Sequence, residues 1–288
     1  ALSCAFRAVL CPGDEVVIFA PYFPEYRMFI ESGAGAKCVV VPPSVVDFQI
    51  NFDALEQCLN EKTKAVVINS PNNPSGAVYA EQTIRRLAEM LTEKEHAYGH
   101  PIYLISDEPY REIVYDGTQV PFIPHYYADT VVCYSYSKSL SLPGERIGYV
   151  LVPPQAADSS DLYAAVCGAG RALGYVCAPS LFQRVAARCA GMTGDISAYQ
   201  ANRDLLYQGL TAMGYRCIKP AGAFYLFPQT LEPDDRAFCE RAKKYDLLVV
   251  PGSDFGAPGH MRISYCVRED TIRRALPLFE KLAQEYST

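Results

Sequence analysis

Side chains that could bind and react with a charged ligand follow several apolar runs of the sequence. Asn73, Asp107 and Lys138 each come within a few residues of the end of such a run. A lysine surrounded by hydroxyl groups can act as a nucleophile when its pKa is depressed, and it then commonly forms a Schiff base with a carbonyl compound. We therefore predict covalent chemistry centred on Lys138.

Lys138 has neighbours that suit a phosphate group and an aromatic ring. Ser135 and Ser137 offer hydroxyl groups, and Arg146, eight residues past the lysine, offers a planar fork of donors. Such a set matches the oxygens of a phosphate dianion. Phe23, which follows another apolar run, offers a face for ring stacking, although the adjacent Tyr22 could supply the ring instead.

The remaining groups suit a ring that carries a positive nitrogen and a negative oxygen. The carboxylate of Asp107 can pair with a protonated ring nitrogen, whereas the phenol of Tyr110 and the amide of Asn73 can hydrogen-bond a phenolate oxygen. A lysine, a phosphate site, a partner for a ring cation and donors to a phenolate together describe pyridoxal phosphate. This is the cofactor that the residues predict.

Strand and helix patterns alternate over the first two thirds of the chain. Helical spacing is clear at residues 84–91, and a short helix is expected at 52–59 with Asp53 as its cap. Buried-strand runs occupy residues 16–20, 37–41, 65–69, 102–105, 130–134 and 147–152. This alternation indicates an α/β domain over residues 1–190, in which helices cover both faces of a mainly parallel sheet and ligands bind at the carboxyl ends of its strands.

The rest of the chain has a different character. A long helix is expected from about Ile196 to Met213, and Pro277 should kink the last helix. Short strand patterns fall at 215–218, 223–227, 247–250 and 261–266, between helical patterns at 236–245 and 271–282. We predict a smaller α+β domain over residues 191–288, joined to the first by the long helix.

Composition narrows the functional class. With 26 Lys and Arg against 32 Asp and Glu, the net charge of −6 argues against binding to nucleic acid or to an anionic membrane. No apolar run reaches the length of a membrane helix, and a soluble cytoplasmic protein is expected. The 11 cysteines form no C-x-x-C pair, so we predict neither a disulfide framework nor a metal site.

Five short segments, taken together, resemble those of one enzyme family. They are Asn73-Pro74-Ser75-Gly76, Asp107-Glu108-Pro109-Tyr110, Ser135-x-Ser137-Lys138 with Arg146 and Gly148, Gly222-Ala223-Phe224-Tyr225, and Arg262-Ile263-Ser264. In this order they are similar to the signature segments of the class I/II aminotransferases, which are pyridoxal-phosphate enzymes of fold type I. The resemblance covers essentially the whole chain.

The resemblance implies a role for each candidate residue. Lys138 would hold the cofactor as a Schiff base and move a proton between the substrate carbon and the cofactor, while Asp107 would keep the pyridinium nitrogen protonated. Arg262 would clamp the substrate carboxylate with help from Asn73, and the family's shared active sites imply a homodimer. Tyr110 and Asn73 would bind the phenolate oxygen, Ser135, Ser137 and Arg146 the phosphate, and Phe23 would stack on the ring.

The beginning of the chain departs from the family pattern. Residues 1–10 have the spacing of an amphipathic helix that ends at Pro12-Gly13, yet no Met and no cap precede it. In the family, an N-terminal arm, a glycine-containing phosphate loop at a helix N-terminus and a tyrosine that reaches the partner's phosphate come before this helix. We therefore expect that residues upstream are missing from this sequence.

The sequence predicts an aminotransferase that works on an L-amino acid and a 2-oxo acid by a ping-pong route. A β-lyase or an enzyme similar to aminocyclopropanecarboxylate synthase would keep the same cofactor residues. A non-enzymatic alternative is the effector domain of a pyridoxal-phosphate-sensing transcription regulator. The choice among aspartate, alanine and aromatic amino acids stays open at this point.

Overall fold

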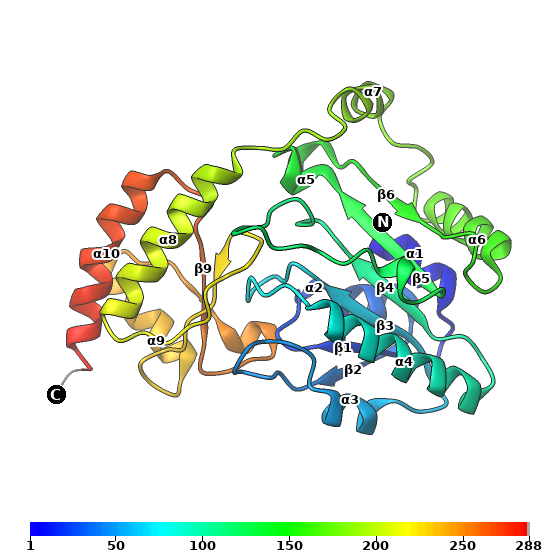
Figure 1. Cartoon of the computed structure of the whole chain (residues 1–288), viewed down its shortest axis with the longest axis horizontal. Coiled ribbons are helices and arrows are strands. Elements are labelled where there is room, and N and C mark those ends of the chain that lie inside the picture. The colour runs from blue at the N-terminus through cyan, green and yellow to red at the C-terminus, as the bar shows by residue number, and fades with distance from the viewer. Residues whose placement is uncertain (287–288) are drawn as a thin grey trace.

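The computed structural model describes residues 1–286 and contains two sheets of different size. The larger sheet has the strand order β2-β1-β3-β4-β5-β6 (Figure 1). Its strands are β1 (Glu15–Phe19), β2 (Lys37–Val41), β3 (Thr63–Asn69), β4 (Tyr103–Asp107), β5 (Thr130–Ser135) and β6 (Gly148–Leu151). Strands β1 to β5 are parallel and β6 is antiparallel to β5, which confirms the mainly parallel sheet.

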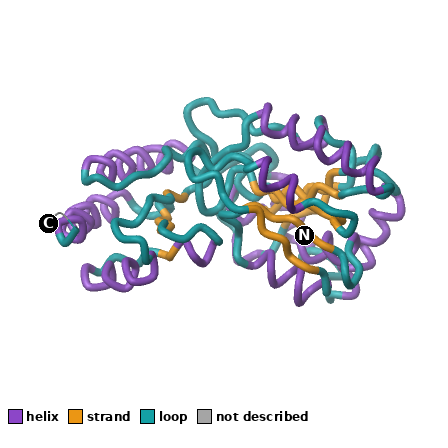
Figure 2. Tube along the Cα trace, turned by 90° about the horizontal axis from the view of Figure 1, so that it is seen from below, coloured by secondary structure: helices purple, strands orange, loops and turns teal. Residues whose placement is uncertain are grey.

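Helices cover both faces of this sheet, and Figure 2 shows them on either side of the strands. Successive residues of a strand point to opposite faces. Val16 and Ile18 therefore belong to one core with helices α1 and α6, whereas Val17 and Phe19 belong to another with α3 and α4. The helices of this part are α1 (Leu2–Val9), α2 (Glu25–Arg27), η1 (Met28–Ser32), α3 (Phe52–Cys58), α4 (Glu81–Tyr98), η2 (Ile123–His125), α5 (Tyr136–Ser139), η3 (Pro143–Glu145), α6 (Ser159–Ala172) and α7 (Ser180–Arg188).

The second part of the molecule, at the left of Figure 1, packs helices on a small antiparallel sheet of order β7-β9-β8. It begins with the long helix α8 (Ile196–Ala212), where the sequence predicted it. The other elements are β7 (Tyr225–Leu226), α9 (Asp235–Ala242), η4 (Lys243–Tyr245), β8 (Val250–Pro251), η5 (Gly252–Phe255), β9 (Met261–Ser264) and α10 (Glu269–Gln284). Helix α10 continues through Pro277.

Three local predictions were wrong. The strand expected at 247–250 is absent from residues 247–249, and β8 begins only at Val250. Residues 215–218 form no strand, because Tyr215 turns its ring into the core beneath α9 and α10 and the backbone of Arg216 pairs only with Gln229. Asn51, not Asp53, caps α3: its side chain accepts a hydrogen bond from the backbone N–H of Ala54. Asp53 lies one residue inside the helix, where its charge still favours the positive end of the helix dipole.

Backbone hydrogen bonds join the two parts. They connect loops that follow strands of the large sheet to the segment just before β7. Val114 pairs with Gly222, and the N–H groups of Ala221 and Gly222 both donate to the carbonyl of Gly76. A Cβ atom at Gly222 would lie 2.7 Å from the Cβ of Pro71, so this close approach requires glycine. These contacts between the two parts, called the seam below, hold the small sheet opposite the strand ends of the large sheet. Across the described residues, no helix is both long and apolar enough to cross a membrane.

Candidate active site

The carboxyl edge of the large sheet carries most of the side chains that the sequence indicated. Strand β4 ends at Asp107 and β5 at Ser135, while Asn73 lies in the turn after β3. The parallel register aligns Asn69 with Asp107 and Asp107 with Cys133, so these three strands end at the same level. The sheet itself therefore brings the groups together, as expected for a ligand site at strand ends.

The carboxyl group of Asp107 has one side-chain hydrogen-bond partner among the described residues. The hydroxyl of Tyr26 donates to its Oδ2 at 2.5 Å, and no ion pair within residues 1–286 includes it. Burial raises the pKa of Asp107 to about 6, the neighbouring charge of Glu108 acts in the same direction, and the Tyr26 hydrogen bond opposes them. A carboxyl group in this setting favours a cationic partner, because a positive charge would offset the cost of its burial.

Tyr26 is a site residue that the sequence analysis missed. It lies on α2, one helical turn beyond Phe23, and its ring packs edge-on against the Phe23 ring at 5.6 Å. The available signal was its position: an aromatic hydroxyl on the segment after β1 reaches the same edge as the end of β4.

Lys138 lies in the short helix α5 directly after β5. The side chain of Ser135 caps this helix by accepting from the N–H of Ser137, which fixes the turn that presents the lysine. Its Nζ is 5.9 Å from the ring centre of Tyr110 and 5.5 Å from that of Phe224. Burial lowers the pKa of Lys138; the positive charges of Arg262 and Arg146 act in the same direction, while the Cys266 thiol opposes them. A lowered pKa increases the fraction of free amine, which is the nucleophilic form.

Arg262 reaches the large sheet from β9. One terminal nitrogen of its guanidinium donates to Oδ1 of Asn73 at 3.0 Å, and the guanidinium carbon lies 4.8 Å from the ring centres of Tyr225 and Phe255. Because Oδ1 of Asn73 accepts from Arg262, the amide nitrogen of the same side chain can donate to a ligand. The two parts of the molecule therefore meet at this pair.

Tyr110 is buried and lies within hydrogen-bonding distance of a second phenol. Its hydroxyl oxygen is 3.0 Å from the hydroxyl oxygen of Tyr225. Burial raises the pKa of Tyr110 well above its ordinary value, so the group is a neutral phenol near pH 7. It can donate a single hydrogen bond.

The proposed phosphate ligands lie around α5. The hydroxyl of Ser135 donates to Oγ of Ser137 at 2.6 Å, which leaves the Ser137 hydrogen for another acceptor. The Arg146 side chain is exposed and donates to the carbonyl of Pro143 at 2.6 Å. Its backbone adopts a left-handed conformation with φ of 52°. The serines are thus already turned toward each other, and Arg146 retains other guanidinium donors.

The structure favours Phe23 over Tyr22 as the ring for stacking. Tyr22 is buried in the contact with the small-sheet part, where its N–H donates to the carbonyl of Phe255 and its ring touches Gly256. A Cβ atom at Gly256 would lie 2.6 Å from that ring. Phe23 is only half-buried and lies near Tyr26 at the edge of the large sheet.

The side chains at this edge fit pyridoxal phosphate. An enclosed carboxyl group lacks a cation, an amine with lowered pKa lacks an acidic partner among the described residues, and the amide nitrogen of Asn73 is free to donate. These are the complements of a ring cation, an aldehyde and a phenolate. The arrangement can therefore hold the cofactor and react with it.

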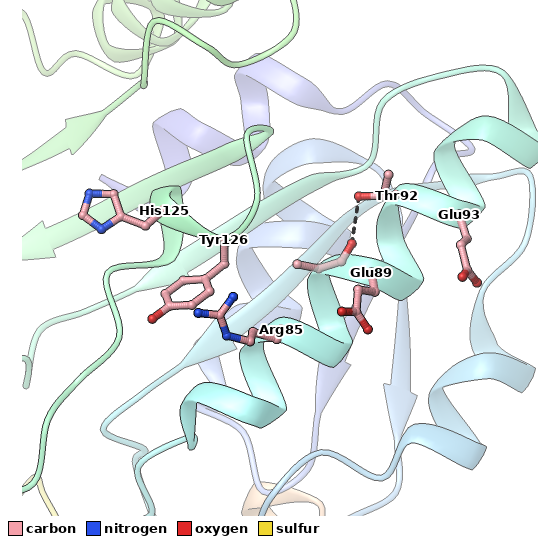
Figure 3. Close-up of a pocket in the computed structure, with 7 residues that line it drawn as sticks. Arg85, Glu89, Thr92, Glu93, His125 and Tyr126 are labelled. Atoms are coloured by element: carbon pink, nitrogen blue, oxygen red, sulfur yellow. Dashed lines mark hydrogen bonds between the residues drawn. The ribbon is translucent and has the colours of Figure 1, made fainter.

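Two hollows elsewhere in the molecule lack these groups. One, of about 370 Å³, lies between α4 and η2 and is lined by Arg85, Glu89, Thr92, Glu93 and His125, among others (Figure 3). Arg85 there is already paired with Glu81 and lies over the Tyr126 ring. The second, of about 210 Å³, includes Phe48 and His260. No cluster of three or more potential metal ligands occurs within residues 1–286.

Comparison with known proteins gives one consistent result. The family model described as aminotransferase class I and II matches residues 1–278. The aspartate/prephenate aminotransferase of Thermus thermophilus is 34% identical over 288 residues, an alignment that covers 98% of this chain and 72% of that protein.

Several solved structures are similar to this chain in both sequence and fold. An aminotransferase from Eubacterium rectale is 59% identical, with a TM-score of 0.98 over 100% of this chain and 72% of its own. An aromatic aminotransferase from Pyrococcus horikoshii is 29% identical, with a TM-score of 0.87 over 99% of this chain and 77% of its own. The fold that these proteins share is the one described above.

Proposed function

The chain belongs to the class I and II aminotransferases, and on that premise we propose that Lys138 and the groups around it form the reaction centre. The protein is a pyridoxal-phosphate-dependent aminotransferase, which transfers an amino group from an amino acid to a 2-oxo acid. The observation that carries the proposed centre is the convergence, at one sheet edge, of an amine with lowered pKa and a carboxyl group with raised pKa that forms no ion pair among the described residues.

Bound pyridoxal phosphate supplies an electron-withdrawing ring that stabilises negative charge on the substrate α-carbon. In our proposal Asp107 holds the ring nitrogen in its protonated form, and Tyr110 and Asn73 donate to the phenolate oxygen. Ser135, Ser137 and Arg146 bind the phosphate, and Phe23 stacks on the ring. Charge-assisted hydrogen bonds of this kind orient the cofactor as well as hold it.

Lys138 is the proposed covalent anchor and the base that moves the proton. Burial lowers its pKa, which increases the fraction of free amine, and α5 holds that amine beside Tyr110 and Phe224. When it is not bound to the cofactor, the same amine would move a proton between the substrate α-carbon and the cofactor carbon that it anchors. A single residue then serves both steps.

Arg262 is the proposed receptor for the substrate carboxylate. Asn73 and the rings of Tyr225 and Phe255 hold the guanidinium in place, so little side-chain entropy is lost when a carboxylate binds. The planar fork can bind both carboxylate oxygens, whereas lysine presents only a point charge.

The test is an absorbance spectrum of the encoded protein loaded with pyridoxal phosphate. We expect a pH-dependent band at wavelengths longer than those at which the protein itself absorbs. An amino acid should convert this band to another form, and a 2-oxo acid should restore it. The assay includes acidic and aromatic amino acids because the relatives named above carry both substrate types in their names. Lys138→Ala should lose the pH-dependent band and at least about a thousandfold in turnover.

The same experiment separates transamination from the alternatives. Release of ammonia and a 2-oxo acid without any acceptor would indicate a β-lyase, and an unchanged band with every amino acid would favour a sensor domain. The Thermus, Eubacterium and Pyrococcus relatives are all named as aminotransferases, which supports transamination. A Lys138→Ala variant that keeps the band would remove Lys138 from the proposal.

Domain division, assembly and location complete the proposal. We propose a large domain over residues 1–190 and a small one over 191–288. Two cores that lie wholly within residues 1–190 support this division, while the core of the small sheet also takes in Tyr110, Ile113 and Tyr115. We propose a homodimer, supported by exposed apolar residues on and after α6 and on α7: Tyr163, Tyr175, Val176 and Leu181 are 63–70% exposed. Light scattering would show a single-chain mass if the dimer is wrong.

Eleven free cysteines support a reducing cytoplasmic location.

A further inference from the structure

Tyr225 lies between two side chains that the proposed function uses. Its hydroxyl oxygen is 3.0 Å from that of Tyr110, and its ring supports the Arg262 guanidinium at 4.8 Å. The side chain is buried, and Tyr110 is the hydrogen-bond partner of its hydroxyl. Tyr225 therefore contacts both the group proposed for the phenolate and the group proposed for the substrate carboxylate.

Counting hydrogens determines the direction of the bond between the two phenols. Each hydroxyl has one hydrogen, so Tyr110 cannot donate to Tyr225 and to a cofactor oxygen at the same time. If Tyr110 donates to the phenolate, the hydroxyl of Tyr225 must donate to Tyr110. Among the described residues its hydrogen bonds involve no other acceptor.

The surroundings make Tyr225 suited to donate. Burial raises the pKa values of both phenols, and the positive charge of Arg262 counteracts this at both; the guanidinium lies 4.8 Å from the ring centre of Tyr225. The phenol closer to the cation is the better hydrogen-bond donor. A chain from Tyr225 through Tyr110 to an anionic oxygen is also cooperative, because each bond polarises the next.

We propose that Tyr225 is a positioning residue of the transamination site: its hydroxyl directs the Tyr110 hydrogen to the phenolate oxygen of the cofactor, and its ring holds Arg262 ready for the substrate carboxylate. This inference rests on the roles proposed above for Tyr110 and Arg262. It assigns two separable tasks to one side chain, one to the hydroxyl and one to the ring.

The hydroxyl is tested by Tyr225→Phe, which keeps the ring and the shape. Weaker donation to the phenolate leaves more negative charge in the conjugated ring and raises the proton affinity of the Lys138 nitrogen bound to it. In a spectrophotometric pH titration of the loaded protein, we expect the midpoint of the cofactor band to rise by about half a unit. The kcat should fall about threefold while KM stays within twofold.

The ring is tested by Tyr225→Leu, with Tyr225→Met as a second variant in case the first is poorly folded. Loss of the cation–π contact should weaken binding of succinate, a carboxylate that does not react, by about fivefold. Tyr225→Phe should leave the succinate Kd within twofold. Thermal unfolding checks that each variant is folded.

Tyr127→Phe is the matched control. Its hydroxyl is also buried and donates to the carbonyl of Ile102, with the Glu95 carboxylate as a second partner, but it lies in the core beneath α4. It should change stability without moving the band midpoint or the succinate Kd. A Tyr225→Phe protein that titrates like the parent, or shifts of equal size in the control, would overturn the proposal.

Failure of the proposed function gives a different result. In that case the parent protein itself shows no Lys138-dependent band, whatever residue stands at position 225. If the parent shows the band and both Tyr225 variants keep its midpoint and the parent's succinate Kd, the reaction centre stands and the role of Tyr225 is wrong.

Discussion

Two charged side chains, the fully buried Arg203 at the contact between the two parts and the half-buried Asp107 at the sheet edge, differ in their partners. The side chain of Arg203 is 0% exposed, yet it lies within 3 Å of carboxylates on Asp116 and Asp204. It also donates to the carbonyl of Pro220 and lies over the ring of Tyr115. Asp107 has one hydroxyl partner and forms no ion pair among the described residues.

The difference separates structural charge from functional charge. Burial disfavours the Arg203 cation, but the bond to Asp116 and the charge of Asp204 more than offset this, so its pKa is raised. For Asp107 burial dominates and the carboxyl pKa rises to about 6. A buried charge with every partner present stabilises the fold, whereas one without a partner is costly until a ligand supplies the opposite charge.

The largest effect is expected from a change at Asp107, the carboxyl group without an ion pair. Asp107→Asn keeps the shape and the Tyr26 contact but cannot stabilise a ring cation, so kcat/KM should fall by about three orders of magnitude. Steady-state kinetics of the loaded protein measures this, with exposed Asp53→Asn as the control. Activity within tenfold of the parent would mean that Asp107 does not face the ring nitrogen.

Arg203→Ala tests the paired side. It empties a fully buried site and removes bonds across the seam, so the free energy of unfolding should fall by about 3 kcal/mol. Arg274, which is 71% exposed and paired with Asp270, is the control, and its alanine variant should cost less than about 0.5 kcal/mol. Urea unfolding gives both numbers; equal losses would show that the seam does not depend on Arg203.

The pH dependence of the cofactor-free protein sharpens the contrast. The folded state holds the Asp107 proton more tightly than the unfolded state does, because its pKa is raised to about 6. Relative to Asp107→Asn, the parent should lose about 2 kcal/mol of unfolding free energy as pH rises from about 4 to about 6, and little beyond. Unfolding curves at several pH values test the sign, and a difference that grows in the opposite direction contradicts it.

The smallest effect concerns the one partner that Asp107 has. Tyr26→Phe removes the hydrogen bond that favours the carboxylate, so the pKa of Asp107 should rise further and kcat/KM should fall about fivefold. The acidic limb of the pH–rate profile should move upward. Tyr103→Phe, whose hydroxyl bonds the carbonyl of Ala157, is the control and should leave that limb in place.

The strand predictions were accurate where burial is strongest. Residues 130–134 coincide with most of β5 and are all buried, since continuous apolar runs flanked by turns have few alternatives in a doubly covered sheet. Residues 37–41 also coincide with β2, although this edge strand is only partly buried. The segment 215–218 shows the limit, because its alternation reflects one ring packed in a core and not a ladder of backbone bonds. Helices α6 and α7 were not predicted: α6 has a weak apolar stripe, whereas α7 is clearly amphipathic and its pattern was missed.

The candidate site was predictable as far as strand ends define it. Asn73, Asp107 and Ser135 follow from the rule that parallel strands end at one edge, and Lys138 follows from its place after β5. The roles of Tyr26 and Tyr225 depend on contacts across 81 and 115 residues, and for Tyr26 the sequence offered no more than its position after β1. Local spacing carries no record of such contacts.

By itself, the sequence determined which chemical groups stand at the strand ends and the family to which the chain belongs, because both depend on residue types at short spacing. Tertiary structure alone decided which of those groups are paired. The parallel register, the approach of Gly222 to Pro71 and the reach of β9 bring Arg262 to Asn73 and Tyr225 to Tyr110. These distances arise only when the two parts of the molecule pack together. Short sequence segments therefore supply the residue types of the site, and the tertiary structure brings them into contact.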